Sequence, residues 1–510
     1  LSRRETAVAS IARRPEAAQL APLLASIDGE VDANLKARKT QLANFLSASF
    51  SKNTEDRIAA INSLSTDTSV EARAVLNQIL TTTTGVALTA PEGNIAATLD
   101  PMPDAEQSYT ALVDANLAAP KQTAGDIKKA LEANIVNGRI AGFPLGQMDD
   151  TIVRHAAYSA LADAGLVPVL ITQAVRDAKL SKHVFYQVYD EPNVEVTIAA
   201  ETARKSADNR VATAQFADLT LDALSLASIF FLAAIGLAIT FGVMGVINMA
   251  HGEFIMMGAY TGYVVQSFIP NYTVSIFVAL PLAFAITFIA GVVMERLVIR
   301  RLYHRPLETL LATFGISIAL QQLAKNVFGT QARPLTSPDW LAGAWVVNDI
   351  IQISYIRIAI FILALLFLGL IIYILKRTRL GLEVRAVTQN PGMASSMGIN
   401  PDRINMLTFG LGSGIAGIAG VAIGLYAKVT SEMGSDYIVQ SFMTVVVGGV
   451  GNVWGTLAGA AMIGFGQKGI EWLNPSNTLA AQTYMILFVI LFIQFRPKGI
   501  VALKGRAAGD

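Results

Sequence analysis

The sequence predicts an all-α protein in which a mainly helical soluble domain precedes a polytopic α-helical membrane domain. Hydrophobic residues make up 53% of the 510 residues. Charged residues gather early: residues 1–218 hold 21 Lys and Arg and 26 Asp and Glu, whereas residues 219–510 hold 18 and 12. The second part also contains all four Trp residues and several long apolar runs. A helix needs about 20 mainly apolar residues to cross the hydrocarbon core of a bilayer.

This pattern divides the chain into four parts. We expect a soluble domain at residues 1–200, a polar linker at 201–218, a membrane domain at 219–500 and a short tail at 501–510.

Within the soluble domain, apolar residues recur at helical spacing in two places. Residues 56–80 show it around a break at 65–69, and residues 151–178 show it around a break at 164–165. Each segment predicts a pair of short helices. Residues 183–200 alternate in polarity, which predicts a small β-hairpin.

The soluble domain carries no recognisable catalytic constellation. His155 and His183 lie far apart and lack the spacing of metal ligands. The chain has no Cys, which excludes disulfides and thiolate metal sites. We expect neither a metal nor a cofactor, and no nucleic-acid partner. A docking or positioning role is the remaining interpretation of this mildly acidic domain.

The membrane domain contains about nine apolar segments that are candidates for membrane passes. Two of them, Phe254–Ile269 and Ile438–Val450, are short and bordered by glycine. The others are Leu219–Phe241, Val274–Ile299, Leu307–Phe328, Ile350–Leu375, Ile404–Tyr426, Val453–Leu473 and Leu479–Phe495.

Lys and Arg residues of the membrane domain gather in three clusters, at 296–305, 376–403 and 496–506. Nine alternating passes put all three clusters on one side of the membrane. Because an excess of Lys and Arg marks cytoplasmic loops, the pattern predicts a cytoplasmic C-terminus. In a bacterial inner membrane, the N-terminal domain would then be periplasmic.

The stretch GVINMAHGEFIMMGAY places Asn248, His251 and Glu253 between apolar runs. Ionisable groups at membrane depth are costly and usually face a bundle interior, a watery cavity or a partner. Gly252, among other glycines, allows close helix contact. Two interpretations remain open: these side chains line or gate a path through the membrane, or they cap a half-helix.

A second unusual stretch, SDYIVQSFMTVVVGGVGNVWGTLAGA, ends a short apolar run at Gly448, Gly449 and Gly451 before a new helix starts. Short, glycine-interrupted segments at corresponding places in the two halves of a transporter point to its substrate region. Ordinary packing of small residues between helices is the alternative interpretation.

The loop at residues 376–407 contains a predicted short helix that begins at Pro391 and ends at Gly398. Proline suits the first position of a helix, and Asn390 before it is a suitable cap. Its apolar residues are Met393, Ala394, Met397 and Ile399. These side chains need a partner, so we expect the helix to dock on another protein, with a membrane-surface anchor as the alternative.

Several of these stretches, in the same order, resemble the branched-chain amino acid permease family of bacterial ABC importers. The resemblance covers about Leu219–Ile500 and is carried by Gly245–Tyr260, Arg305–Gln322, Arg385–Val421, Gly448–Ala460 and the closing FRPKGI. Within that family, Val246–Gln266 and the long N-terminal extension are most similar to the permease of the urea transporter.

The resemblance implies an inner-membrane permease subunit, not itself an enzyme, that moves urea or short amides into the cytoplasm. It implies a second related permease, two cytoplasmic ATPase subunits and a periplasmic substrate-binding protein as partners. The helix at Asn390–Ile399 would be the coupling helix that contacts an ATPase subunit. The sequence has no GxxxxGK[ST] loop, so ATP hydrolysis would belong to the partners.

An uncharged solute such as urea needs hydrogen-bond donors and acceptors along its path. The candidates are Asn248, Gln321, Gln322, Ser413 and Thr444, with His251 and Glu253 nearby. The alternative solute, a branched-chain amino acid, would need groups for both an ammonium and a carboxylate. An ion-coupled secondary transporter is less favoured because Asp222, Glu295 and Glu308 fall near the ends of the predicted passes.

Overall fold

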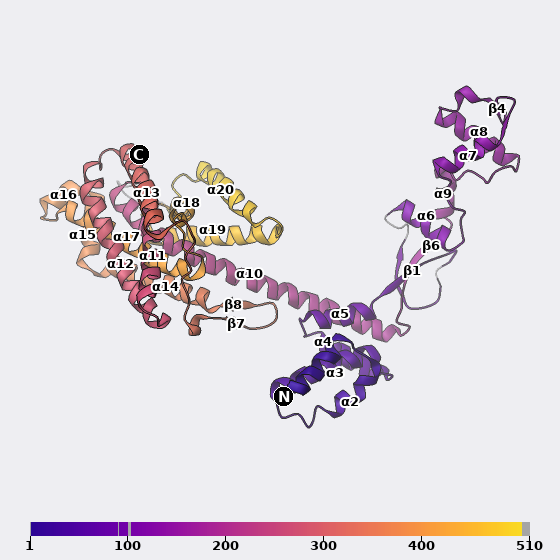
Figure 1. Ribbon diagram of the computed structural model, residues 1–510, viewed down its shortest axis with the longest axis horizontal. Coiled ribbons are helices and arrows are strands. Elements are labelled where there is room, and N and C mark those ends of the chain that lie inside the picture. Colours follow the sequence, from indigo (N-terminus) through magenta and orange to yellow (C-terminus); the bar gives the residue numbers. More distant parts are fainter. Residues whose placement is uncertain (1, 90, 100–103, 502–510) are drawn as a thin grey trace. The chain divides into compact units, whose positions relative to one another are not determined.

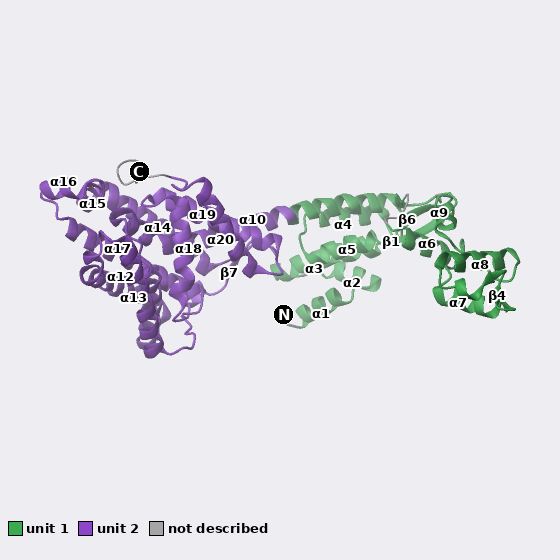
Figure 2. Cartoon of the chain, turned by 90° about the horizontal axis from the view of Figure 1, so that it is seen from above, with its two compact units in different colours: residues 1–211 green, residues 212–510 purple. Residues whose placement is uncertain are grey.

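The computed structural model describes residues 2–89, 91–99 and 104–501 and divides the chain into two compact units (Figure 2). Unit 1 spans residues 1–211 and unit 2 spans residues 212–510. Helices dominate both units and the strands are short, which confirms the predicted all-α class (Figure 1). The expected tail lies outside the described residues, except for Val501.

Five α-helices open the described part of unit 1 and share one apolar core. They are α1 (Ser2–Arg13), α2 (Leu20–Ala25), α3 (Ala33–Phe50), α4 (Thr54–Leu64) and α5 (Val70–Ile79). Asp32 and Asn53 cap α3 and α4, because their side chains accept backbone N–H groups of the first turn. Leu46 and Ile61 are fully buried in this core. The helix pair predicted within residues 56–80 is confirmed as α4 and α5.

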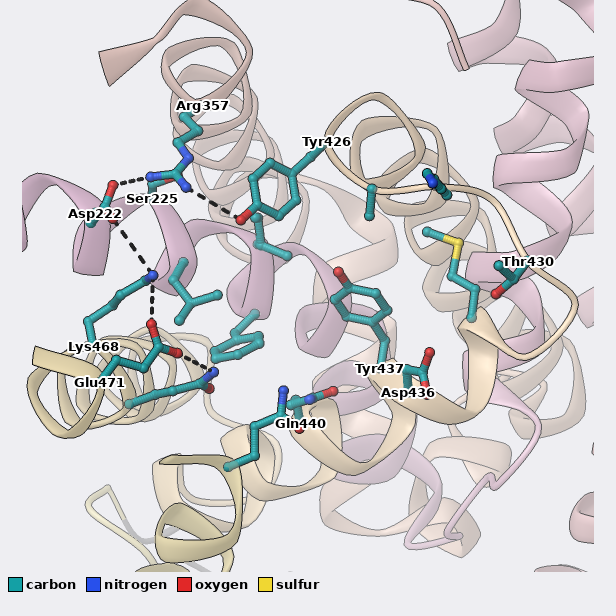
Figure 3. A pocket seen from close by; sticks show the side chains of 18 residues that line it. Asp222, Ser225, Arg357, Tyr426, Thr430, Asp436, Tyr437, Gln440, Lys468 and Glu471 are labelled. Atoms are coloured by element: carbon teal, nitrogen blue, oxygen red, sulfur yellow. Dashed lines mark hydrogen bonds and ion pairs between the residues drawn. The ribbon is translucent and has the colours of Figure 1, made fainter. Parts of the chain in front are cut away.

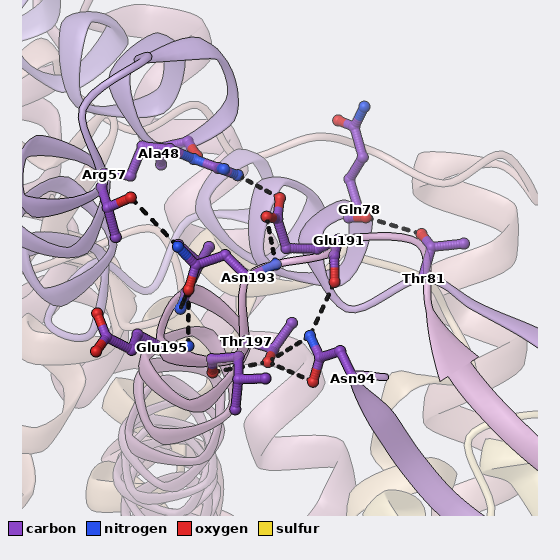
Figure 4. Close-up of polar contacts among 12 residues, drawn as sticks. Ala48, Arg57, Gln78, Thr81, Asn94, Glu191, Asn193, Glu195 and Thr197 are labelled. Carbon is purple, nitrogen blue, oxygen red and sulfur yellow. Dashed lines mark hydrogen bonds and ion pairs between the residues drawn. The ribbon is translucent and has the colours of Figure 1, made fainter. Parts of the chain in front are cut away.

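An antiparallel sheet with the strand order β1-β6-β2 follows. Its strands are β1 (Thr82–Ala87), β2 (Ile95–Leu99) and β6 (Val184–Tyr189). The hairpin predicted within residues 183–200 is therefore wrong, since β6 pairs with earlier strands. The chain enters a helix instead, because Asn193 Oδ1 accepts the N–H groups of Glu195 and Val196 at 2.9 and 3.4 Å (Figure 4).

The rest of unit 1 is a small helical group with a three-stranded sheet. It comprises α6 (Ala105–Asp114), α7 (Ala124–Ala133), β3 (Ile135–Val136), β4 (Arg139–Ile140), β5 (Phe143–Pro144), α8 (Thr151–Asp163) and α9 (Gln173–Leu180). Tyr158 and Leu161 of α8 bury against Leu131 of α7. Residues 151–178 form two helices, α8 and α9, but these do not pack as the predicted pair: α8 packs on α7, and α9 packs on α6.

Helix α10 (Val194–Met244) is 51 residues long and contains both the predicted linker and the first predicted pass. Residues 201–218 are thus helical rather than an irregular connection. Buried apolar residues recur along this segment at Ala203, Ala207, Val211 and Ala214, with spacings of three or four residues. This spacing keeps the buried side chains on one helical face, so the polar residues between them do not interrupt the helix.

Ten further α-helices build the described part of unit 2. They are α11 (His251–Phe268), α12 (Tyr272–Leu297), α13 (Pro306–Phe328), α14 (Tyr355–Arg377), α15 (Arg379–Gln389), α16 (Pro391–Ser396), α17 (Pro401–Tyr426), α18 (Met433–Gly448), α19 (Val453–Leu473) and α20 (Thr478–Phe495). A small hairpin, β7 (Ala344–Val346) and β8 (Gln352–Ser354), precedes α14. The pass predicted from Ile350 therefore starts five residues later, at Tyr355.

Among the described residues, six helices are long and apolar enough to cross a membrane, or seven if α18 and α19 form one bent span. The prediction of about nine passes stays a prediction. The ends of α12, α14 and α20 and the start of α17 carry the predicted basic clusters. We call this end of unit 2 the basic end and the other the outer end.

Helix α17 lies at the centre of unit 2, between α11 and α12. Its glycines allow this close packing: a Cβ atom on Gly258 of α11 would lie 1.9 Å from the Gly417 carbonyl oxygen of α17. A Cβ atom on Gly420 would lie equally close to the carbonyl oxygen of Ile255. Small residues at such contacts let helix backbones approach within a membrane.

Candidate functional site

The two short helices α11 and α18 begin at the same point in unit 2. Gly252 and Gly434 lie in their first turns, and a Cβ atom on Gly252 would lie 2.1 Å from the Gly434 carbonyl oxygen. The helix starts are thus joined by a contact that a larger residue at this position would disrupt. We call it the helix junction. Its two helices correspond to the short, glycine-bordered segments expected at 254–269 and 438–450.

From the helix junction the two helices run to opposite ends of unit 2. Helix α11 ends at Phe268, which is 82% exposed, just before α12 starts its long path to the basic end. Helix α18 ends beside the segment that follows α20, where Ile500 N–H donates to the Val447 carbonyl oxygen at 2.8 Å. Helix α20 ends at the basic end, so α18 connects the helix junction with that end.

Glu253 lies in the first turn of α11 and is 1% exposed. Its Oε1 atom accepts hydrogen bonds from Ser317 Oγ at 2.9 Å and from Gln321 Nε2 at 2.8 Å, both on α13. Gln321 Nε2 also donates to Ser435 Oγ on α18 at 2.7 Å. Glu253 therefore ties α11 to α13 and, through Gln321, to α18. Within the described residues, its Oε2 atom has no hydrogen-bond partner.

The neighbouring polar residues, His251 and Asn248, form hydrogen bonds with nearby backbone groups. His251 is 1% exposed, and its Nε2 atom lies 2.9 Å from the Ala233 carbonyl oxygen of α10, so this nitrogen is the donor. Asn248 Oδ1 accepts the Ala250 N–H at 3.0 Å and closes the turn that precedes α11. Asn248 thus shapes the turn before α11, whose N-cap residue is Ala250 with no side-chain cap, and His251 packs against α10.

The remaining predicted path residues do not gather at Glu253. Gln322 is exposed on α13. Ser413 and Thr444 are buried, and each hydroxyl bonds to a carbonyl oxygen one turn back in its own helix, at 2.9 and 2.7 Å. The structure therefore brings Gln321 to Glu253 and adds Ser317 and Ser435. The four-residue spacing of Ser317 and Gln321 is the sequence signal that could have found the first of these.

The predicted structural glycines form the break between α18 and α19, which bend by 118° relative to each other. Gly448 packs against Gly455: a Cβ atom on Gly448 would lie 2.2 Å from the Gly455 carbonyl oxygen. Gly449 and Gly451 have φ angles of +103° and +77°, a backbone region that favours glycine.

A cavity of about 500 Å³ opens at the outer end of unit 2 (Figure 3). Its walls come from α10, the first turn of α14, the end of α17 and parts of α18, α19 and α20. Met433, which directly precedes Gly434, also lines it. The cavity, which we call the outer pocket, therefore extends from the outer end to the helix junction.

Four charged residues of the outer pocket pair with one another (Figure 3). Arg357 forms an ion pair with Asp222 and donates to Tyr426 Oη at 3.4 Å. Lys468 Nζ lies 3.7 Å from Asp222 Oδ2 and 2.8 Å from Glu471 Oε2. Arranged in this way, the four charges fix the relative positions of α10, α14 and α19.

Two further charged residues, Asp436 and Lys428, line the outer pocket and form no ion pair with any described residue. Leu226, Ile229 and Phe230 of α10 supply an apolar wall. The pocket thus combines both signs of charge with an apolar surface. Sequence reasoning missed it because its residues come from separate helices and one loop, far apart in the chain.

The short helix predicted at Pro391 is α16. Asn390 Oδ1 accepts the Met393 N–H at 3.0 Å, which caps its start. Gly398 has a φ angle of +83°, and the chain leaves the helix there. The cap and the stop therefore lie where the sequence placed them.

The sequence predicts one exposed apolar face on this helix. The apolar residues in and beside α16 do not form such a face. Ala394 is 4% exposed and packs with Val384 and Ile404, and Ile399 packs partly against the same cluster. Met393 and Met397 are exposed. Because α16 lies against its own loop, only the two methionines remain for a partner.

Comparison with known proteins identifies a family. Residues 219–494 match the family described as branched-chain amino acid transport system, permease component. The permease protein BraD of Pseudomonas aeruginosa, from a high-affinity branched-chain amino acid transport system, is 28% identical over 297 residues, which are 55% of this chain and 94% of the relative.

Two relatives from Escherichia coli K12 match a similar share of the chain. The high-affinity branched-chain amino acid transport system permease LivH is 27% identical, over 56% of this chain and 95% of its own length. The inner membrane ABC transporter permease YjfF is 28% identical, over 52% of this chain and 78% of its own length. No solved structure matches the chain. Since the family match covers more than half of the chain, this protein belongs to the permease components of branched-chain amino acid transport systems.

Proposed function

We propose that this protein is a permease subunit of an ABC importer for branched-chain amino acids, and that solute enters through the outer pocket. The pocket itself is the observation that carries the proposal. Asp436 offers a carboxylate for an ammonium group, Lys428 offers an ammonium for a carboxylate, and Ile229 and Phe230 offer apolar surface for an aliphatic side chain. The names of the relatives BraD and LivH support the same solute class.

The proposal places the basic end in the cytoplasm of a bacterial cell and unit 1 in the periplasm, following the excess of Lys and Arg at that end. Exposed Met393 of α16 and Met397, which directly follows the helix, are then available to a cytoplasmic ATPase subunit. A second permease, a second ATPase subunit and a periplasmic binding protein complete the importer. The chain itself supplies the path and no ATP chemistry.

Urea or a short amide is the second candidate solute. The matches cover 94–95% of BraD and LivH but only 55–56% of this chain. The family match, at residues 219–494, lies wholly outside unit 1. The resemblance of Val246–Gln266 to the urea transporter's permease also supports this candidate. The unpaired charges of the outer pocket favour the amino acid, because urea carries no charge.

Uptake of labelled leucine and labelled urea by cells with and without this chain separates the two candidates. We expect leucine uptake to be lost on deletion and restored by the wild-type chain. Asp436→Asn and Lys428→Gln should each lower restored leucine uptake about tenfold, the effect of losing one charge-assisted hydrogen bond. Glu432→Gln is the matched control, because Glu432 is an exposed carboxylate that already pairs with Lys325. Loss of urea uptake alone would overturn the choice of solute.

A further inference from the structure

The second oxygen of Glu253 is a buried acceptor that the fold leaves unused. Glu253 is 1% exposed, and both hydrogen bonds to its carboxylate end on Oε1. Within the described residues, Oε2 has no partner. Burying an unpaired polar group destabilises a protein, and the effect is larger for a charged group. Ionisable groups at membrane depth with such a deficit are usually functional.

The surroundings of Glu253 favour a carboxylate that accepts hydrogen bonds. It lies in the first turn of α11, where the partial positive charge of the helix start stabilises a negative group. The start of α18 adds a second helix end: a Cβ atom on Gly434 would lie 2.8 Å from both carboxylate oxygens. Two helix starts therefore converge on one buried carboxylate.

One N–H donor to this carboxylate is already part of the chain. Gln321 carries a carboxamide, whose nitrogen lies 2.8 Å from Oε1 and 2.7 Å from Ser435 Oγ. A solute with an ammonium or a carboxamide group presents the same kind of donor. Both candidate solutes, an amino acid and urea, have such a group.

The position of Glu253 suits a solute contact on the route from the outer pocket to the basic end. Met433 lines the outer pocket, and the next residue, Gly434, contacts Gly252 at the helix junction. The junction thus adjoins both the pocket and Glu253. From there α18 continues to the basic end.

We propose that Glu253 Oε2 accepts a hydrogen bond from an N–H group of the solute as the solute passes the helix junction. The proposal rests on the transport function proposed above. It assigns the site to solutes with an ammonium or carboxamide group and leaves the distinction between them to the charges of the outer pocket. Ser317 and Gln321 hold the carboxylate in place through Oε1.

The test measures solute imported per ATP hydrolysed by the complete importer in proteoliposomes, with binding protein saturated by leucine or by urea. In Glu253→Gln, the amide keeps the size of the side chain but removes the charge. We expect about tenfold less solute per ATP, with ATP hydrolysis itself preserved. Without the acceptor, solute is not retained when the pocket closes, so cycles run empty.

Two matched variants separate this role from a structural one. Ser317→Ala removes a hydrogen bond to Oε1 and leaves Oε2 intact, and Glu308→Gln neutralises an exposed carboxylate on the same helix as Ser317. Glu308→Gln should keep the wild-type ratio of solute to ATP. Ser317→Ala loosens the carboxylate without removing its charge, so it should lower the ratio less than Glu253→Gln does. If Glu253→Gln fails to assemble, Glu253→Asp keeps the charge but withdraws the oxygen, and it should still lower the ratio.

Each outcome has a defined meaning. A wild-type ratio in whichever of the two Glu253 variants assembles overturns the inference, and so does an equal loss in Ser317→Ala. If the ratio falls with leucine but not with urea, the N–H group is that of an ammonium. If it falls with urea but not with leucine, the N–H group is that of a carboxamide. If the wild-type importer moves neither solute, the proposed function fails instead.

Discussion

Replacing Met393 of α16 and Met397, which directly follows the helix, with alanine is expected to weaken binding of the ATPase subunit by about 30- to 1,000-fold. Met393 and Met397 are 62% and 76% exposed, so together they offer more than one complete methionine side chain for burial. Burying one such side chain contributes about 1.5–3 kcal/mol. The pair therefore contributes about 2–4 kcal/mol, which converts to that range of dissociation constants.

The assay is titration of the permease pair, held in nanodiscs, with purified ATPase subunit. Leu479→Ala is the matched control, because Leu479 is 75% exposed but lies at the outer end. Ala394→Arg is unsuitable as a docking variant, since Ala394 is buried in the loop's own cluster and the change would disrupt the loop. Wild-type affinity in the double alanine variant would refute the assignment of α16 as the docking surface.

Two further predictions concern stability. Arg300→Ala leaves the fully buried Glu295 carboxylate without its ion pair at 2.9 Å, so the unfolding free energy should fall by about 3 kcal/mol. Thermal unfolding in detergent measures this, and Arg305→Ala, from an exposed pair, should change little. In unit 1, the Lys39 ammonium lowers the pKa of Glu30 below its ordinary 4.5. This carboxylate therefore stabilises the fold above pH 4.5, and the contribution is lost as the pH falls through the lowered pKa. Hydrogen exchange of α3 at about pH 5 and about pH 3 should show the loss, and Glu30→Gln should reduce the difference; an unchanged difference would contradict this account.

Local signals in the sequence predicted the helices of unit 2 and the ends of α16. The apolar runs had the length of a membrane pass, and the cap at Asn390 and the stop at Gly398 act within one turn of the chain. Such features depend only on neighbouring residues, so the structure reproduces them. The same holds for the break between α4 and α5, where Ser69 caps the second helix.

Local signals failed where distant segments compete for the same residues. The alternation in residues 183–200 suggested a hairpin, but β6 pairs with strands more than 80 residues earlier in the chain. The apolar residues of α16 were assigned to one docking face, but Ala394 packs into a cluster with Ile404. Sequence periodicity shows that a side chain is apolar, but it does not show which neighbour covers it.

The sequence by itself determined that this protein has a long apolar helical domain, a family and a set of polar residues at membrane depth. Only the tertiary structure decided which of those residues meet. Gly252 and Gly434 are far apart in the chain, yet their contact brings Glu253, Gln321 and Ser435 together. The physical reason is that helices form from contacts within a few residues, whereas a site depends on how whole helices pack.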